Sequence, residues 1–264
     1  MSLLAQARQH VCRVGGAELV VYELGQSQAQ PLLLLHGGMG SSHDWDSVVD
    51  ALAQSFRLLL LDFRGHGRSS MGALPLSYAQ HAADVVAVLD HLKLASVNIL
   101  GFSDGGITGY RLALQCPVRV QALATVGAQW RLLDGDPSIP FLQGLTRQRW
   151  EQLFPHALSS YEQENPQPDF DALLGAVKAL WLDRTADGYP SEAVRGIQAP
   201  LLLIRGDNDP LLSLAEVSAL QDALPHAHLW NQAFSGHAVH DDAAEAFLKM
   251  VVDFFCAPSR RRTN

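Results

Sequence analysis

The sequence predicts an α/β fold built on a mostly parallel sheet. Short apolar runs, each ending at Gly, His or Asp, alternate along the chain with segments that have the period of an amphipathic helix. Strands that are continuously apolar are typical of a sheet buried on both faces. The alternation of these two kinds of segment therefore favours an α/β domain whose sheet is flanked by helices.

The expected strands follow one another along nearly the whole chain. The first two form a hairpin, because the β-rich runs Val11–Val14 and Glu18–Glu23 flank the turn residues Gly15 and Gly16. The later strands are the apolar runs Pro31–Leu35, Phe56–Leu61, Val97–Leu100, Val120–Val126 and Pro200–Ile204, followed by Ala227–Phe234. A sheet of about eight strands follows from this series.

The expected helices lie between these strands. The helical segments are Asp44–Gln54, Tyr78–Leu92, Gly105–Gln115, Ala215–Leu224 and Ala243–Phe255. Ser77 is a capping residue directly before the second segment, and Phe247, Val251 and Phe254 recur at helical spacing in the last one. Strand and helix thus alternate up to the end of the chain.

One stretch breaks this alternation. Between Trp130 and Val194 there is no strand-like run, and aromatic residues are scattered among prolines and acidic residues. A structureless loop of this length is uncommon in a compact domain. We therefore expect a helical cap at residues 130–194, inserted into one core domain formed by residues 1–129 and 195–264.

Composition and charge exclude several classes of protein. The 264 residues are 48% hydrophobic and 17% charged, which suits a folded domain with a large core. The net charge of −8 argues against a nucleic-acid partner, and no apolar run reaches the roughly 18 residues of a membrane span. The cysteines are odd in number and widely spaced, which is typical of free thiols: they are Cys12, Cys116 and Cys256. Met1–His10 lacks the pattern of a signal peptide. We expect a cytoplasmic protein; its oligomeric state is left open.

A nucleophile motif follows the strand Val97–Leu100. The sequence Gly101-Phe102-Ser103-Asp104-Gly105 is a G-x-S-x-G pattern, and a helical segment begins directly after it. Side chains at Gly101 or Gly105 would collide with neighbouring backbone in so sharp a turn. This context predicts that Ser103 is a catalytic nucleophile held at the tip of a strained turn.

A serine nucleophile needs a histidine base and a carboxylate that orients it. Asp207 and Asp209 follow the strand Pro200–Ile204, and His237 follows the last strand, so the chain order is Ser, Asp, His. Either aspartate could be the acid on this reasoning, and we favour Asp209. His237 is favoured over the other ten histidines because of its place after the last strand.

The reaction also needs two N–H donors for the oxyanion. Gly38, in the glycine-rich turn after the strand Pro31–Leu35, is the preferred first donor, with Met39 as the alternative. The second is the amide of Asp104, at the start of a helix. No HExxH or CxxC spacing occurs, so we expect neither a metal nor a cofactor.

With these motifs the chain resembles the α/β-hydrolase superfamily over nearly its whole length. The motifs are HGGMGSSHDW (36–45), DFRGHGRS (62–69), GFSDGG (101–106), GDNDP (206–210) and SGHAVH (235–240). The resemblance implies the triad Ser103, Asp209 and His237 and a cap between the sixth strand and the next helix. It implies a serine hydrolase, such as a carboxylesterase, acting on a small-molecule ester.

The elbow is similar to that of valacyclovir hydrolase, in which the acid after the nucleophile contacts the α-amino group of the substrate. Carried to Asp104, this resemblance implies an amino-acid ester or another cationic acyl group. Aromatic cap residues are expected to enclose the substrate, namely Trp130, Trp150, Phe154 and Trp181. Cleavage of a C–C bond, release of an N-terminal residue from a peptide and a receptor that does not turn over remain alternatives.

Overall fold

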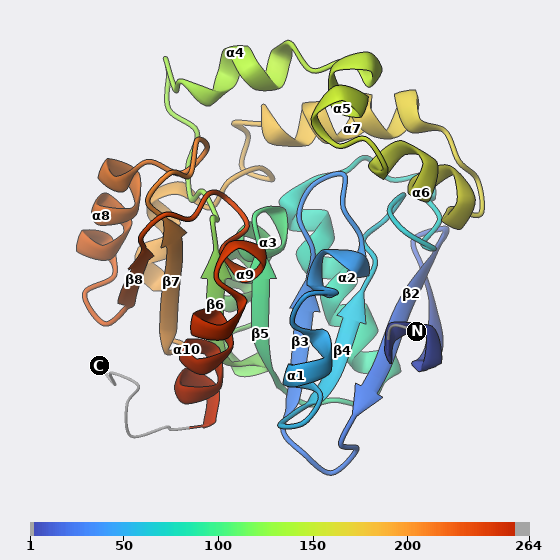
Figure 1. The fold of residues 1–264 in the computed structure, drawn as a ribbon, viewed down its shortest axis with the longest axis horizontal. Helices are drawn as coiled ribbons and strands as arrows, with labels where there is room; N and C mark the ends of the chain where they lie inside the picture. The colour runs from blue at the N-terminus through green and yellow to red at the C-terminus, as the bar shows by residue number, and fades with distance from the viewer. Residues whose placement is uncertain (1–2, 257–264) are drawn as a thin grey trace.

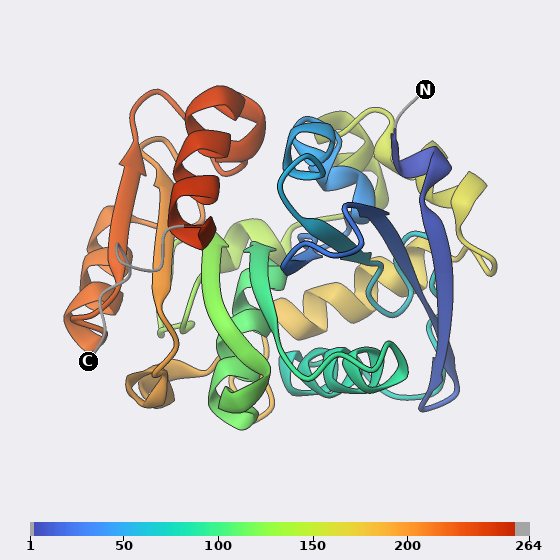
Figure 2. The same cartoon turned by 90° about the horizontal axis from the view of Figure 1, so that it is seen from below.

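The computed structural model describes residues 3–256, which form an eight-stranded sheet with helices on both faces (Figures 1 and 2). The spatial order is β1-β2-β4-β3-β5-β6-β7-β8, antiparallel at the β1-β2 and β2-β4 pairs and parallel from β4 to β8. The strands are β1 (Arg8–Val14), β2 (Ala17–Gly25), β3 (Pro31–Leu35), β4 (Arg57–Leu61), β5 (Val97–Phe102), β6 (Val120–Val126), β7 (Leu201–Gly206) and β8 (His228–Gln232). The predicted fold class is confirmed.

The N-terminal hairpin has the turn that the sequence predicts. Gly15 and Gly16 both have positive φ, +54° and +76°, which glycine adopts without steric cost. The register pairs Val14 with Ala17 at the turn and Arg8 with Glu23 at the open end.

The sheet is buried on both faces because helices cover each side (Figure 2). One side carries α2 (Tyr78–His91), α3 (Asp104–Gln115) and α8 (Leu214–Ala223), and the other carries α1 (Val49–Leu52) and α10 (Ala244–Cys256). In β3, Leu33 and Leu35 belong to the first apolar core and Leu32 and Leu34 to the second. This two-sided burial explains why the strands are continuously apolar.

Two predicted elements are shorter in the structure. The expected helix Asp44–Gln54 is only a 3₁₀ turn, η2 (Ser42–Trp45), and the single turn α1. Residues 46–48 separate the two, and the φ of −127° at Val48 is not helical. The last strand ends at Gln232 rather than Phe234, since Phe234 has a φ of +63°, which is incompatible with a strand.

The segment between β6 and β7 consists of helices that lie over the carboxyl ends of the strands (Figure 1). We call four of them the cap helices: α4 (Ser138–Gln143), α5 (Arg147–Leu153), α6 (Ala157–Glu164) and α7 (Phe170–Trp181). A 3₁₀ turn, η4 (Ser191–Gly196), leads back to β7. The other short elements are η1 (Leu3–Gln6), η3 (Pro117–Arg119) and α9 (Val239–Asp242). The division into domains at residues 130 and 194 stays a prediction.

Within residues 3–256, no helix combines the length and the apolar character that crossing a bilayer requires.

Candidate active site

Ser103 occupies the sharp turn between β5 and α3. Its backbone has φ +49° and ψ −114°, a strained conformation for a residue with a side chain. A Cβ atom at Gly101 would lie 2.4 Å from the Gly105 carbonyl oxygen, and one at Gly105 would lie 2.1 Å from that of Leu35. The motif therefore needs glycine at both positions, and the turn is fixed further by a 2.8 Å hydrogen bond from the Ser103 amide to the Val126 carbonyl.

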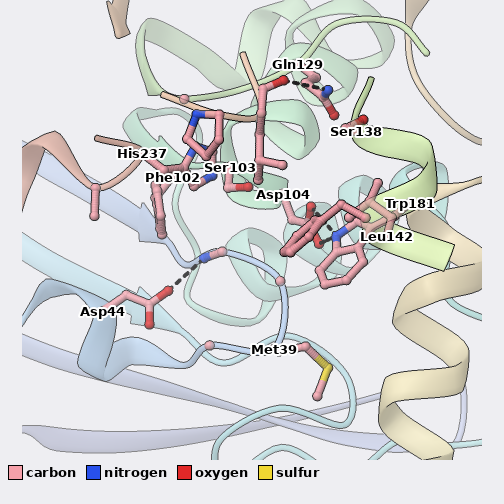
Figure 3. A pocket seen from close by; sticks show the side chains of 18 of the residues that line it. Met39, Asp44, Phe102, Ser103, Asp104, Gln129, Ser138, Leu142, Trp181 and His237 are labelled. Carbon is pink, nitrogen blue, oxygen red and sulfur yellow. Dashed lines mark hydrogen bonds between the residues drawn. The ribbon is translucent and has the colours of Figure 1, made fainter. Parts of the chain in front are cut away.

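Ser103 opens onto a cavity of about 750 Å³ between the carboxyl ends of the strands and the cap helices (Figure 3). This volume is in the range of sites for small organic ligands. Its walls are mostly apolar, and the cap contributes Trp150, Phe154 and Trp181. Three of the four aromatic residues expected to enclose the substrate thus line the cavity.

Trp130 does not line this cavity, in contrast to the expectation for it. Its side chain is fully buried, and its indole Nε1 donates to the Glu216 carbonyl oxygen at 3.2 Å. The Arg131 guanidinium lies 4.1 Å from the ring centroid. Trp130 follows β6 closely and packs toward α8, so it supports the core rather than the cavity.

His237 and Asp209 meet at the cavity wall. His237 Nδ1 lies 2.9 Å from Oδ2 and 3.0 Å from Oδ1 of Asp209. The Asp209 carboxylate is buried and also accepts the Leu211 amide at 2.8 Å. The His237 ring packs against Phe102, the residue before Ser103, with ring centroids 5.0 Å apart. Ser103 and His237 both line the cavity (Figure 3).

The second candidate acid, Asp207, lies in a different environment. Asp207 is exposed. Its backbone amide donates a hydrogen bond to the Gln232 carbonyl at 2.9 Å. The structure pairs His237 with Asp209 and leaves Asp207 at the surface.

The two candidate oxyanion donors of the glycine-rich turn differ in their surroundings. The Met39 amide is 3.3 Å from His66 Nε2, to which it donates a hydrogen bond. Gly38 lies against the nucleophile side of the cavity: a Cβ atom there would be 2.6 Å from Asp104 Oδ2 and 2.5 Å from the Trp181 ring. Only glycine allows this close approach.

Asp104 is the first residue of α3, and its carboxylate is buried. Trp181 Nε1 donates to both carboxylate oxygens at 2.9 Å, and the Tyr78 hydroxyl donates to Oδ1 at 2.9 Å. Burial raises the pKa of Asp104 to about 6, although the hydrogen bonds from Tyr78 and Trp181 and the nearby His237 favour the ionised form. Both partners are neutral, so the negative charge of the ionised carboxylate is not cancelled by an ion pair.

Sequence reasoning missed three residues at this site. Tyr78 and Tyr189 complete the surroundings of Asp104: their rings lie 5.1 Å apart, and the Tyr189 hydroxyl donates to the Trp181 carbonyl at 3.0 Å. Asp44 lines the cavity from the turn after β3 and accepts the Gly37 amide at 2.9 Å. Tyr78 and Asp44 each stand at the start of an expected helix, which is an ordinary position for them and gave no signal of a site.

The charge of the cavity wall has one sign. Asp44, Asp104 and Asp241 line it, and none of its lining residues is Lys or Arg. In the described part of the chain, no three His, Cys, Asp or Glu side chains are grouped as a metal site requires.

The family model described as "alpha/beta hydrolase fold" matches residues 30–170, more than half of the chain. The chain belongs to the α/β-hydrolase family. This α/β-hydrolase is 30% identical to the pimeloyl-[acyl-carrier protein] methyl ester esterase of Nitrosomonas europaea over 242 residues, which cover 82% of this chain and 92% of that protein. Its relatives include esterases, lipases and other hydrolases, and also the dihydrolipoyllysine-residue acetyltransferase component of the acetoin cleaving system of Pseudomonas putida. The family model and the esterase and lipase relatives confirm the expected enzyme class, a hydrolase of the carboxylesterase type.

Solved structures share the fold over almost the full length. The enol-lactonase from Burkholderia xenovorans LB400 matches this α/β-hydrolase with a TM-score of 0.75 and 25% identity, covering 94% of this chain and 100% of that one. The meta-cleavage product hydrolase from Pseudomonas fluorescens IP01 has a TM-score of 0.79 and 19% identity, covering 96% and 98%. At 19% identity the second likeness concerns the fold alone.

Proposed function

We propose that this chain is a serine hydrolase that cleaves a small carboxylic ester through an acyl-enzyme. The observation that carries the proposal is the Asp209–His237 pair, held at 2.9 Å in the wall of the cavity onto which Ser103 opens. A buried carboxylate at Nδ1 fixes the tautomer that leaves Nε2 free to act as a base. The methyl ester esterase that is 30% identical to the chain supports an ester as the bond cleaved.

Catalysis proceeds in two matched steps. Ser103 Oγ bonds to the ester carbonyl carbon while His237 takes the hydroxyl proton; the bond to the alcohol oxygen then breaks, and His237 returns the proton to the departing alcohol. Water repeats the sequence on the acyl-enzyme and releases the carboxylic acid. The hydrogen bond between Ser103 and His237 is expected to form or shorten when substrate is bound, as catalytic hydrogen bonds commonly do.

The amides of Gly38 and Asp104 act as the oxyanion donors. The Asp104 amide is at the first position of α3, where an amide has no partner inside the helix and the helix dipole favours negative charge. Gly38 faces the same side of the cavity, next to Asp104. Met39 is the weaker candidate because its amide already donates to His66.

The substrate class follows from the cavity wall. Its mostly apolar lining, with Trp150, Phe154 and Trp181 from the cap, favours a hydrophobic acyl or alcohol group. A carboxylate has about four acceptor sites, so Asp104 can bind an ammonium group in addition to Trp181 and Tyr78. With no Lys or Arg in the wall, an ester that carries a protonated amine, such as an aminoacyl ester, is favoured over an anionic one.

The test is turnover of p-nitrophenyl acetate and of a p-nitrophenyl aminoacyl ester by the wild type and by Ser103→Ala. Loss of the nucleophile should lower kcat by several orders of magnitude for both esters. Unchanged turnover by Ser103→Ala would refute the nucleophile, and absence of turnover by the wild type would favour a ligand receptor. The ratio of kcat/KM between the two esters tests the preference for a cation independently.

A further inference from the structure

Asp44 packs against the turn that carries Gly38. Its Oδ2 atom accepts the Gly37 amide at 2.9 Å (Figure 3). Gly37 directly precedes Gly38, so this hydrogen bond fixes the backbone next to the proposed donor. A Cβ atom at Gly40 would lie 2.3 Å from Asp44 Oδ2, which shows how closely the turn folds around this carboxylate.

The other amides of the turn also have acceptors. The Met39 amide donates to His66 Nε2, and His66 Nδ1 is 2.7 Å from the Arg64 carbonyl oxygen, to which it donates, so Nε2 is the acceptor. Burial lowers the pKa of His66 to about 4 and keeps it in this neutral form. The Gly40 amide donates to the Gly37 carbonyl at 3.2 Å.

Gly38 is the exception among residues 37–40. Among the hydrogen bonds of the described residues its amide has no acceptor, although those of Gly37, Met39 and Gly40 each have one. A backbone N–H without a partner beside a cavity is a donor held ready for a ligand atom. A turn rich in glycine is flexible unless other contacts fix it.

We propose that Asp44 is a positioning residue that fixes the Gly37–Ser41 turn so that the Gly38 amide points at the oxyanion. The inference rests on the proposed acyl-transfer function and adds a residue to it. Asp44 acts by accepting hydrogen bonds and not by its charge, because a carboxyl oxygen accepts a backbone N–H in either protonation state. Burial among acidic neighbours, Asp241 and Asp62, raises the pKa of Asp44 to about 7, which is consistent with a neutral acceptor being sufficient.

The experiment compares Asp44→Ala, which removes the acceptor, with Asp44→Asn, which keeps an oxygen for the Gly37 amide and removes the charge. Asp50→Ala, an exposed aspartate in α1, is the matched control. Each variant is assayed for kcat and KM with a p-nitrophenyl ester. Each is also assayed for inhibition by a trifluoromethyl ketone, whose adduct with Ser103 places an oxyanion in the same position as the reaction does.

The expected loss of kcat for Asp44→Ala is about 10- to 100-fold, below the roughly 100- to 1,000-fold loss for deletion of an oxyanion donor itself. KM should change less than about 3-fold, and ketone binding should weaken in parallel with kcat. Asp44→Asn should stay within about 5-fold of the wild type in both kcat and ketone affinity. Asp50→Ala should match the wild type.

Three results would overturn the inference. The first is unaltered ketone binding in Asp44→Ala, and the second is an equal loss of kcat in Asp44→Ala and Asp44→Asn. The third is an effect of Asp44→Ala on KM alone. If Asp44→Ala does not fold, Asp44→Asn alone decides, since a large loss of ketone affinity there contradicts a role as acceptor. Failure of the proposed function looks different. In that case the wild type itself does not bind the ketone, or Ser103→Ala retains turnover.

Discussion

Trp181 Nε1 lies 2.9 Å from both carboxylate oxygens of Asp104, so the last residue of cap helix α7 is hydrogen-bonded to the residue that follows Ser103. The Tyr78 hydroxyl, at the start of α2, reaches the same carboxylate. Three helix ends thus meet at one buried acid. This contact ties the position of the cap to the nucleophile turn.

Trp181→Phe should therefore destabilise the protein more at pH 8 than at pH 5. The pKa of Asp104 is raised to about 6, so the carboxylate is ionised at pH 8 and protonated at pH 5. Loss of a hydrogen bond to a buried charged group costs about 1.5–3 kcal/mol, and less for a neutral one. Urea unfolding at the two pH values measures the difference.

Trp150→Phe is the matched control for this measurement. Trp150 lines the same cavity, its ring lies 6.3 Å from that of Trp181, and its buried Nε1 has no hydrogen-bond partner. The change should cost packing energy without the pH dependence. An equal pH dependence in both variants would contradict the role given to the Trp181–Asp104 contact.

Replacement of Asp209 by Asn should lower kcat by up to about 10,000-fold, because an amide at this position favours the wrong tautomer of the histidine. The same change at Asp207 should leave kcat close to that of the wild type, since Asp207 is exposed and does not contact His237. Steady-state kinetics of the two variants with one ester decide between the two acids. A large loss in Asp207→Asn alone would reverse the assignment.

The preference for an aminoacyl ester over a neutral ester should increase as the pH rises from 5 to 7. With its pKa raised to about 6 by burial, Asp104 is mostly protonated at pH 5 and mostly ionised at pH 7, whereas an α-amino group, with a pKa of about 7.7, is still mostly protonated at pH 7. Both esters have the same leaving group and react through His237, so the titration of His237 cancels in the ratio of their kcat/KM values. In Asp104→Asn the ratio should be low and independent of pH; a ratio that still rises would assign the preference to another group.

Gly38→Ala should lower kcat by at least about 10-fold, because its Cβ would lie 2.5 Å from the Trp181 ring and 2.6 Å from Asp104 Oδ2. The clash displaces either the turn or the cap helix. Gly175→Ala is the control within α7: no atom lies within 4 Å of its Cβ position, so this change should stabilise the helix by about 1 kcal/mol. Thermal unfolding and kcat together separate the two effects, and normal activity in Gly38→Ala would contradict the close approach.

Much of the fold follows from local patterns in the sequence. The apolar runs that became β3 to β7 had to be strands buried on both faces, and Gly15 and Gly16 could only form a tight turn between the first two strands. The helix expected at Asp44–Gln54 is interrupted at Val48, whose φ of −127° is not helical, and the Asp44 side chain accepts the Gly37 amide in the preceding turn. Periodicity reports burial and does not report such side-chain to backbone contacts.

The site was predictable only where a motif marked it. The strand and helix around Ser103, and the loops after β7 and β8, indicated which residues to choose, and the structure brings Asp209 and His237 together. The roles given to these residues stay predictions. Tyr78 and Trp181 could not be linked to Asp104 from the sequence, because long-range contacts between helix ends leave no local pattern. For the same reason, Trp130 could not be distinguished from Trp150 before its packing was known.

The proposed mechanism requires an acyl group bound to Ser103. The decisive measurement is intact-protein and peptide mass spectrometry after rapid acid quench of the enzyme with a p-nitrophenyl ester. The expected result is one added acyl group, located on the peptide that contains Ser103 and absent from Ser103→Ala, together with a burst of p-nitrophenol. An acyl group on another residue, or steady turnover by Ser103→Ala, would contradict it.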